Sequence, residues 1–211
     1  MDWQLLATIG MIHSLALISP GPDFALMVKI ASQQTRQTAL AAALGIAIAI
    51  LVHTILSLTG VSLLIHSSPV LYTIVQLCGA SYLGWMGIGA LKSAFRIQEG
   101  TSTLDETSPA ISAISGFNRG LLTNLLNPKA LVFFITLFST LMTPSISFNT
   151  RIAAAALLFT LSTAWFGLLA ILLSKPKMQR KFQQFNRLVN GLIGFVFISV
   201  SSLILYQLIF L

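Results

Sequence analysis

Charged residues are scarce in this 211-residue chain. Only 8% of the sequence is Asp, Glu, Lys or Arg, whereas soluble domains are roughly one-quarter charged. This scarcity argues against a soluble globular protein. Intrinsic disorder is excluded as well, because it requires low hydrophobicity and high charge, and here 55% of residues are apolar and mean hydropathy is +0.88. The composition predicts a small polytopic membrane protein with little chain left for a soluble domain.

Potential metal and redox ligands are equally few. Cys78 is the single cysteine, which excludes an internal disulfide and a multi-thiolate metal site, and we expect its thiol to be buried. His13, His53 and His66 are scattered without the spacing of metal ligands. No metal and no cofactor is therefore predicted. The N-terminal Met1-Asp2-Trp3 lacks the basic start of a cleaved signal peptide, so we expect the first hydrophobic run to be retained.

Long apolar runs dominate the rest of the chain. A membrane-spanning helix needs about 20 mostly apolar residues, and six runs of that kind are present. The fold class predicted is an all-α membrane protein with six transmembrane helices, forming a single transmembrane domain over residues 1–211. The runs cover about 3–31, 39–65, 70–92, 119–143, 150–174 and 188–210.

Polar segments of very different length connect these runs. The longest, about 93–117, holds three of the five acidic residues, and its Ser, Thr, Pro and Gly content predicts a flexible surface loop. Lys175 to Arg187 reads as a basic linker. The acidic residues of the long loop are Glu99, Asp105 and Glu106.

The basic residues show a strong bias between the two sides of the membrane. All but two of the 12 Lys and Arg residues lie in or beside the odd-numbered connections. Arg151 is in an even-numbered one, and Lys129 is inside the fourth run. Because cytoplasmic loops carry the excess of Lys and Arg, the odd connections are predicted to be cytoplasmic and both termini to lie outside. The biased residues are Lys29, Arg36, Lys92, Arg96, Arg119, Lys175, Lys177, Arg180, Lys181 and Arg187.

The same bias accounts for the basic pI of about 10.1. Nucleic-acid binding would need these charges clustered on one solvated face, but they sit in short stretches between apolar runs. No nucleic-acid partner is predicted. The lipid bilayer is the partner that the composition indicates.

The two halves of the chain share an organisation. Half one covers about 1–92, a cytoplasmic loop about 93–117, and half two about 118–211, with three runs in each half. The first run of each half is interrupted by proline, at Pro20-Gly21-Pro22 and at Asn127-Pro128. Three-span units insert with opposite orientation, which predicts two inverted repeats with broken helices 1 and 4. Such matching interruptions point to a binding site near the membrane midplane.

Each interruption is followed by a charge. Asp23 follows Pro22 and Lys129 follows Pro128, and a charge inside an apolar span costs roughly 2.5–3.5 kcal/mol on insertion scales. Asp23 is the candidate proton carrier and ammonium site. The blander interpretations are a helix-capping aspartate and a lysine that reaches the interface.

Further polar residues flank these charges. Asn124 and Asn127 are three residues apart and share a helix face, so we assign them to the same binding site. Gly21 and the prolines Pro20, Pro22 and Pro128 complete the candidate substrate-binding set. His13 and His53 lie in the first two runs, where a structural hydrogen bond is the ordinary role and a proton relay the alternative. His66 is expected at an interface.

One buried anion and one buried cation suit a zwitterion. Asp23 would receive the α-ammonium of an amino acid and Lys129 its α-carboxylate, or the two charges pair with each other in one state. A cationic side chain would need a second buried acid, and none is available in the spans. The charges therefore favour small neutral polar amino acids.

The two interrupted motifs resemble a known family. Ser19-Pro20-Gly21-Pro22-Asp23, followed by the run from Gly120 to Ala130 (GLLTNLLNPKA), is similar to the lysine exporter and homoserine/threonine resistance family of amino-acid exporters. Size and six spans agree over essentially the whole chain, and the run from Gly79 to Gly87 looks like the threonine/homoserine branch. The resemblance implies export of amino acids, driven by protons, across the bacterial inner membrane. Family members move other substrates too, including basic amino acids.

Three classes of function remain to be weighed. A proton-coupled exporter working by alternating access leads. An enzyme is disfavoured, since the sequence lacks a nucleophile motif, paired buried acids and a metal motif. The remaining alternative is a passive channel or a subunit of a larger assembly. Small residues at helical spacing, such as Ala41, Gly45 and Ala49, predict close helix packing within the chain or between copies of a homo-oligomer.

Overall fold

The computed structural model describes residues 1–19, 21–95, 109–142 and 146–210, with backbone alone for 61–67, 176–177 and 179–187. This described part is helical, with eight α-helices and no strand. The all-helical class predicted from the sequence is confirmed.

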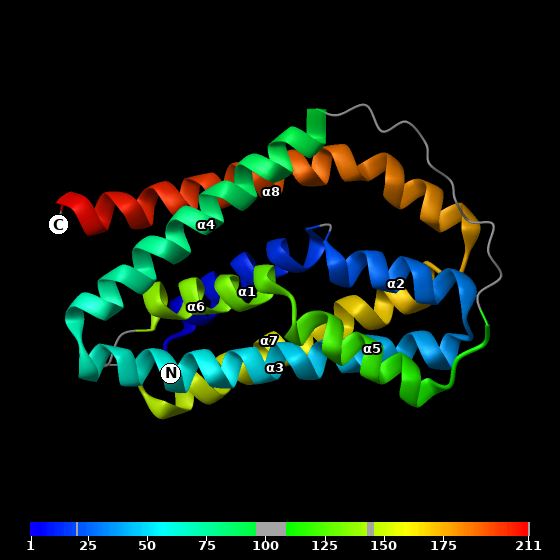
Figure 1. Ribbon diagram of the computed structural model, residues 1–211, viewed down its shortest axis with the longest axis horizontal. Helices are drawn as coiled ribbons and strands as arrows, with labels where there is room; N and C mark the ends of the chain where they lie inside the picture. Colours follow the sequence, from blue (N-terminus) through cyan, green and yellow to red (C-terminus); the bar gives the residue numbers. More distant parts are fainter. Residues whose placement is uncertain (20, 96–108, 143–145, 211) are drawn as a thin grey trace.

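Four helices are long enough to cross a membrane alone. They are α3 (Arg36–Ser67), α4 (Pro69–Phe95), α7 (Phe148–Leu172) and α8 (Pro176–Phe210), and they run along the long axis of the molecule (Figure 1). Each has an apolar stretch of 23 to 27 residues, and about 20 suffice. These stretches are Arg36–Gly60, Pro69–Phe95, Phe148–Leu172 and Leu188–Phe210.

The other four helices form two bent pairs. The first is α1 (Trp3–Ile18) with α2 (Pro22–Gln33), and the second is α5 (Ala113–Leu125) with α6 (Pro128–Leu141). The bends are 56° and 57°, and each pair is long and apolar enough for one span only when taken together. By length and composition, the described chain thus has four candidate spans, or up to six if each bent pair counts as one.

Local chemistry explains both breaks. Pro22 and Pro128 are the first residues of α2 and α6, the helical position where a missing N–H is harmless. Farther back in a continuous helix the same rings would remove a hydrogen bond and clash with the preceding turn. Asn127 caps α6 by accepting a hydrogen bond at its side-chain oxygen from the backbone N–H of Lys129 (3.0 Å).

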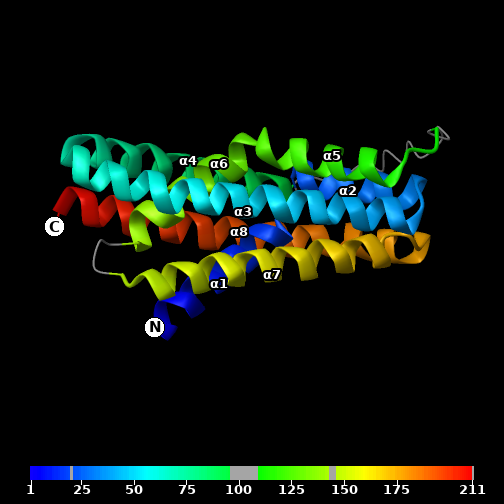
Figure 2. The same ribbon diagram turned by 90° about the horizontal axis from the view of Figure 1, so that it is seen from below.

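The two bent pairs run in opposite directions. Figures 1 and 2 show α1 entering from the end that holds the chain termini and α2 continuing to the far end, whereas α5 and α6 follow the reverse course. The breaks therefore lie near the middle of the long axis. The α2–α3 and α7–α8 connections and the start of α5 share one end, and the α3–α4 connection lies at the other. This grouping agrees with the charge bias, and the orientation in a membrane stays a prediction.

Small residues allow the helices to pack closely. α3 packs on α5 and α7, and α4 on α8 and α6. A Cβ on Gly45 would collide with the backbone of Phe117 in α5, and one on Gly87 would lie 2.9 Å from the carbonyl oxygen of Gly194 in α8. These two glycines thus serve contacts within the chain, while Gly89 has nothing within 4 Å.

Three expectations need correction. The long loop is shorter than 93–117, because α4 continues to Phe95 and α5 begins at Ala113. Ser112 caps α5 by accepting a hydrogen bond from the Ser115 N–H. Residues 96–108 of the loop, which include the three acids, lie outside the described residues. The prediction of a basic linker from Lys175 to Arg187 is also wrong in part, since α8 begins at Pro176. Cys78 is exposed rather than buried, on the outer face of α4.

Candidate functional site

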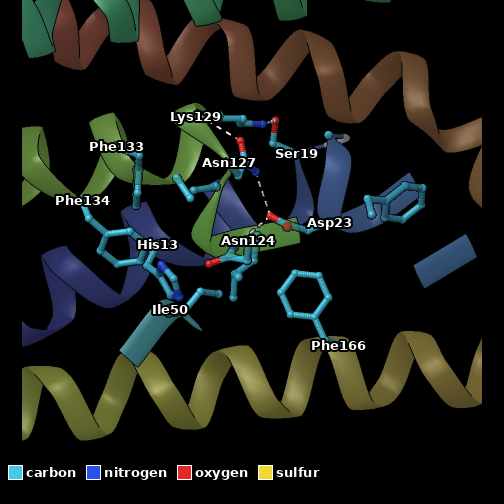
Figure 3. A pocket seen from close by; sticks show the side chains of 15 residues that line it. His13, Ser19, Asp23, Ile50, Asn124, Asn127, Lys129, Phe133, Phe134 and Phe166 are labelled. Atoms are coloured by element: carbon cyan, nitrogen blue, oxygen red, sulfur yellow. Dashed lines mark hydrogen bonds between the residues drawn. The ribbon is translucent and has the colours of Figure 1, made fainter. Parts of the chain in front are cut away.

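The two helix breaks enclose a cavity (Figure 3). Its lining comes from α1, α2, α3, α5, α6 and α7. One wall is polar, with a carboxylate, an ammonium group, two carboxamides and a hydroxyl, and the opposite wall is aromatic and aliphatic. The polar side chains are Ser19, Asp23, Asn124, Asn127 and Lys129.

Asp23 is held by the facing helix pair. It is the second residue of α2, and its Oδ2 accepts hydrogen bonds from Asn124 Nδ2 (3.0 Å) and Asn127 Nδ2 (3.1 Å). The α2 N-terminus carries a partial positive charge, which favours a carboxylate here. Its Oδ1 is buried and has no hydrogen-bond partner. Asp23 thus keeps one free acceptor at the cavity.

Lys129 occupies the corresponding position of the second pair. It is the second residue of α6, and its Nζ donates a hydrogen bond to Ser19 Oγ (2.7 Å). A helix N-terminus disfavours a cation, whereas a C-terminus favours one, and Ser19 is the C-cap of α1. The long lysine stem therefore moves the charge from an unfavourable helix end to a favourable one.

The arrangement is reciprocal between the two breaks. Asp23 of the first pair bonds to the end of α5, and Lys129 of the second pair bonds to the end of α1. Two helix N-termini and two C-termini converge on one cavity, and each of the two N-termini carries a charged side chain. Such a site offers both signs of charge to a ligand.

The two asparagines are the most enclosed polar groups of this wall. Asn124 is 1% exposed and Asn127 4%. Asn127 acts twice, because its oxygen caps α6 while its nitrogen donates to Asp23. Asn124 has a buried Oδ1 without a hydrogen-bond partner, a second free acceptor.

The rings of two histidines lie close to Phe134. The His53 ring is stacked on Phe134 at 5.8 Å and the His13 ring lies 5.7 Å from it, tilted. His53 Nε2 donates to the Asn124 carbonyl oxygen (3.1 Å), which only accepts. His53 thus supports the end of α5, and His13, but not His53, lines the cavity.

The structure brings together five of the eight predicted site residues. Asp23, Lys129, Asn124, Asn127 and Gly21 line the cavity. A Cβ on Gly21 would lie 3.5 Å from Lys129 Nζ, so the glycine leaves room for this ammonium group. Pro22 and Pro128 are exposed and do not line the cavity; they set its helix ends. Pro20 lies outside the described residues.

Sequence reasoning missed part of the lining. Ser19 belongs to the proline motif, and its place just before the break is the signal that identifies it as a lining residue. Ile50 and Phe166 also line the cavity, and they come from runs that are apolar throughout, where hydrophobic periodicity gives no signal. Within the described ranges, no group of three or more His, Cys, Asp or Glu could hold a metal ion.

These features define a polytopic membrane protein with an amphoteric site at the crossing of two broken helices. The chain belongs to the LysE type translocator family, which matches residues 14–208. This confirms the resemblance drawn from the two proline motifs.

Several bacterial proteins are similar to this chain over almost its whole length. The chain is 35% identical to a threonine efflux protein of Salmonella typhi and 34% to one of Escherichia coli K12, in each case over 92% of this chain and 94% of the relative. An uncharacterized membrane protein of Haemophilus influenzae is 24% identical over 96% of the chain and 97% of its own length. No solved structure matches. The chain is thus a bacterial membrane protein.

Proposed function

We propose that this protein is a secondary active exporter of small neutral amino acids, with threonine as the first candidate. The observation that carries the proposal is the half-buried pair of opposite charges, Asp23 and Lys129, on the two facing helix breaks. The names of the efflux relatives support the same substrate class. The same names speak against an enzyme.

The polar wall fits the two ends of a zwitterion. Asp23 Oδ1 lacks a hydrogen-bond partner and would accept from an α-ammonium group, while Lys129 would bind the α-carboxylate. Charge-assisted hydrogen bonds of this kind contribute about 1.5–3 kcal/mol each. Asn124, Asn127 and Ser19 hold the two charges in place.

The opposite wall favours a small, uncharged side chain. It includes Phe133, Phe134 and Phe166, and the cavity lining contains no acid other than Asp23. A basic substrate would bring a second cation without a counter-charge. Neutral amino acids avoid that penalty, which is large in a low-dielectric site.

Alternating access is the proposed transport mechanism, with each bent pair counted as one broken span. The chain then has six spans in two inverted three-span halves, which rock about the central site as in other inverted-repeat transporters. Proton entry from outside would neutralise Asp23, weaken its hold on the substrate ammonium and couple release to the proton gradient. The termini would face the periplasm and the basic connections the cytoplasm.

Efflux from preloaded cells tests this function. Cells with the protein or an empty vector are loaded with labelled threonine, homoserine, valine or lysine, with and without an uncoupler. We expect uncoupler-sensitive efflux of threonine or homoserine, and little of lysine. Equal efflux in both strains for every amino acid would contradict the proposal, and ion conductance insensitive to amino acids would favour a channel.

An isosteric change at Asn127 gives a sharper prediction. Asn127→Asp keeps the oxygen that caps α6 but replaces the donor to Asp23 with a second carboxylate. Like charges at hydrogen-bond distance repel, so we expect threonine efflux to fall at least about tenfold, corresponding to roughly 1.4 kcal/mol. The yield of folded protein should stay near the unmodified level.

Asn118→Asp is the matched control, because Asn118 is exposed on α5 and does not line the cavity. It introduces the same charge and should leave efflux unchanged. Equal losses in both variants would show that the effect of Asn127→Asp is not specific to Asp23.

A further inference from the structure

The cavity contains more hydrogen-bond acceptors than donors to satisfy them. Asp23 Oδ1, Asn124 Oδ1 and His13 Nδ1 are buried without a hydrogen-bond partner, and all three residues line the cavity. Buried polar atoms are rarely left unpaired. An α-ammonium group at Asp23 would satisfy Asp23 Oδ1, whereas Asn124 Oδ1 points away from Asp23 (Figure 3) and His13 Nδ1 lies farther off.

The other ring nitrogen of His13 fixes the role of this one. Ser162 Oγ donates to the Leu158 carbonyl oxygen (2.7 Å), so it accepts from His13 Nε2 (2.9 Å). In the neutral imidazole Nε2 therefore carries the hydrogen, and Nδ1 is an acceptor. The Ser162 bond, from α7, also holds the ring in one orientation.

The surroundings of His13 are apolar. Its ring lies 6.3 Å from Phe133 and 5.7 Å from Phe134, and the side chain is 1% exposed. Figure 3 shows it beyond Asn124, away from Asp23 and Lys129. Among the residues that line the aromatic and aliphatic wall of the cavity, His13 alone offers a polar side-chain atom. A group that reaches it from a zwitterion bound at the polar wall must be the substrate side chain.

We propose that His13 Nδ1 is the specificity-determining acceptor for a side-chain hydroxyl, so that the site selects hydroxy amino acids over their hydrocarbon isosteres. This deepens the proposed function and rests on it. The hydroxyl donates to Nδ1 while its carbon chain contacts the phenylalanine wall. A methyl group in the same place leaves Nδ1 unpaired, and sites built to bond a hydroxyl reject analogues that lack it.

Threonine and valine are the appropriate probes, because they differ by a hydroxyl in place of a methyl group at nearly equal size. The measurement is counterflow in proteoliposomes, giving KM for each amino acid with the unmodified protein. We expect a clear preference for threonine. His13→Gln keeps a nitrogen donor near the Nε2 position for Ser162 but leaves no acceptor at the Nδ1 position. The ratio of the two KM values should then shift about tenfold toward valine. Only the KM for threonine should rise, and the KM for valine should not change.

Two further variants separate this role from structural damage. His13→Asn places an oxygen near the Nδ1 position and should retain the preference, even if losing the Ser162 bond lowers the maximal rate. His53→Gln changes the histidine that does not line the cavity and should leave the KM ratio unaltered. An unchanged ratio in a transporting His13→Gln protein would overturn the subsite alone. Absence of amino-acid counterflow by the unmodified protein would overturn the proposed function as well.

Discussion

Replacing Asp23 with asparagine should reduce threonine efflux at least tenfold and up to about a hundredfold, because a charge-assisted hydrogen bond contributes about 1.5–3 kcal/mol. The amide can still accept from Asn124 or Asn127, so the helix crossing should persist. What disappears is the negative charge that would bind the substrate ammonium and balance Lys129. The measurement is initial efflux from preloaded cells, normalised to the amount of protein in the membrane.

Asp2→Asn is the matched control for this change. Asp2 is exposed and caps α1 by accepting from the Leu5 N–H (3.0 Å), a role that asparagine fills equally well. Efflux by this variant should equal that of the unmodified protein. Full efflux by Asp23→Asn would contradict both the ammonium site and the proton-carrier role.

A double variant decides between the two interpretations of the charges. If Asp23 and Lys129 serve only to neutralise each other, Asp23→Asn combined with Lys129→Gln should restore efflux, since no buried charge is left unpaired. If they bind the two ends of the substrate, the double variant should fold as well as the unmodified protein and transport nothing. We expect the second result, because both charges face the cavity.

The helix breaks and their charges were predictable because their chemistry is local. Proline cannot continue a helix whichever neighbours it has, and a charge within an apolar run stands out in any fold. The sequence thus indicated Pro22-Asp23 and Pro128-Lys129 as corresponding positions, and the structure places both side chains at one cavity. The inverted repeat itself stays a proposal.

Helix boundaries and the aromatic wall were not predictable in the same way. Asn118 and Arg119 interrupt the hydropathy of the fourth run, so hydropathy places the start of this run at about 119. The helix α5 nevertheless starts at Ala113, because it packs along α3. The face of α1 that carries His13, and that of α7 that carries Phe166, depend on tertiary packing. In a helix that is apolar on every face, the sequence does not indicate which face is buried.

A close backbone contact between α3 and α5 gives the second large effect. Gly120 of α5 packs on the backbone of Ala42 in α3, where an added Cβ would collide with the carbonyl oxygen and lie 2.9 Å from the carbonyl carbon. Backbone atoms within a helix cannot move aside as a flexible side chain can. Gly120→Ala should therefore separate α3 from α5. Overpacking costs about 1–3 kcal/mol or more, which corresponds to a Tm lowered by roughly 2–12 °C in a chain of this size.

Gly167→Ala isolates the contact from the intrinsic effect of the substitution. Gly167 is inside α7 with nothing within 4 Å of an added Cβ, so alanine there should leave Tm unchanged or raise it slightly, because alanine favours a helix by about 1 kcal/mol over glycine. Equal Tm values for the two variants in detergent would contradict the close α3–α5 contact. Asn124 lies one turn beyond Gly120, so separating the helices should also withdraw its amide from Asp23 and lower efflux, linking the stability of this crossing to the charge that the site depends on.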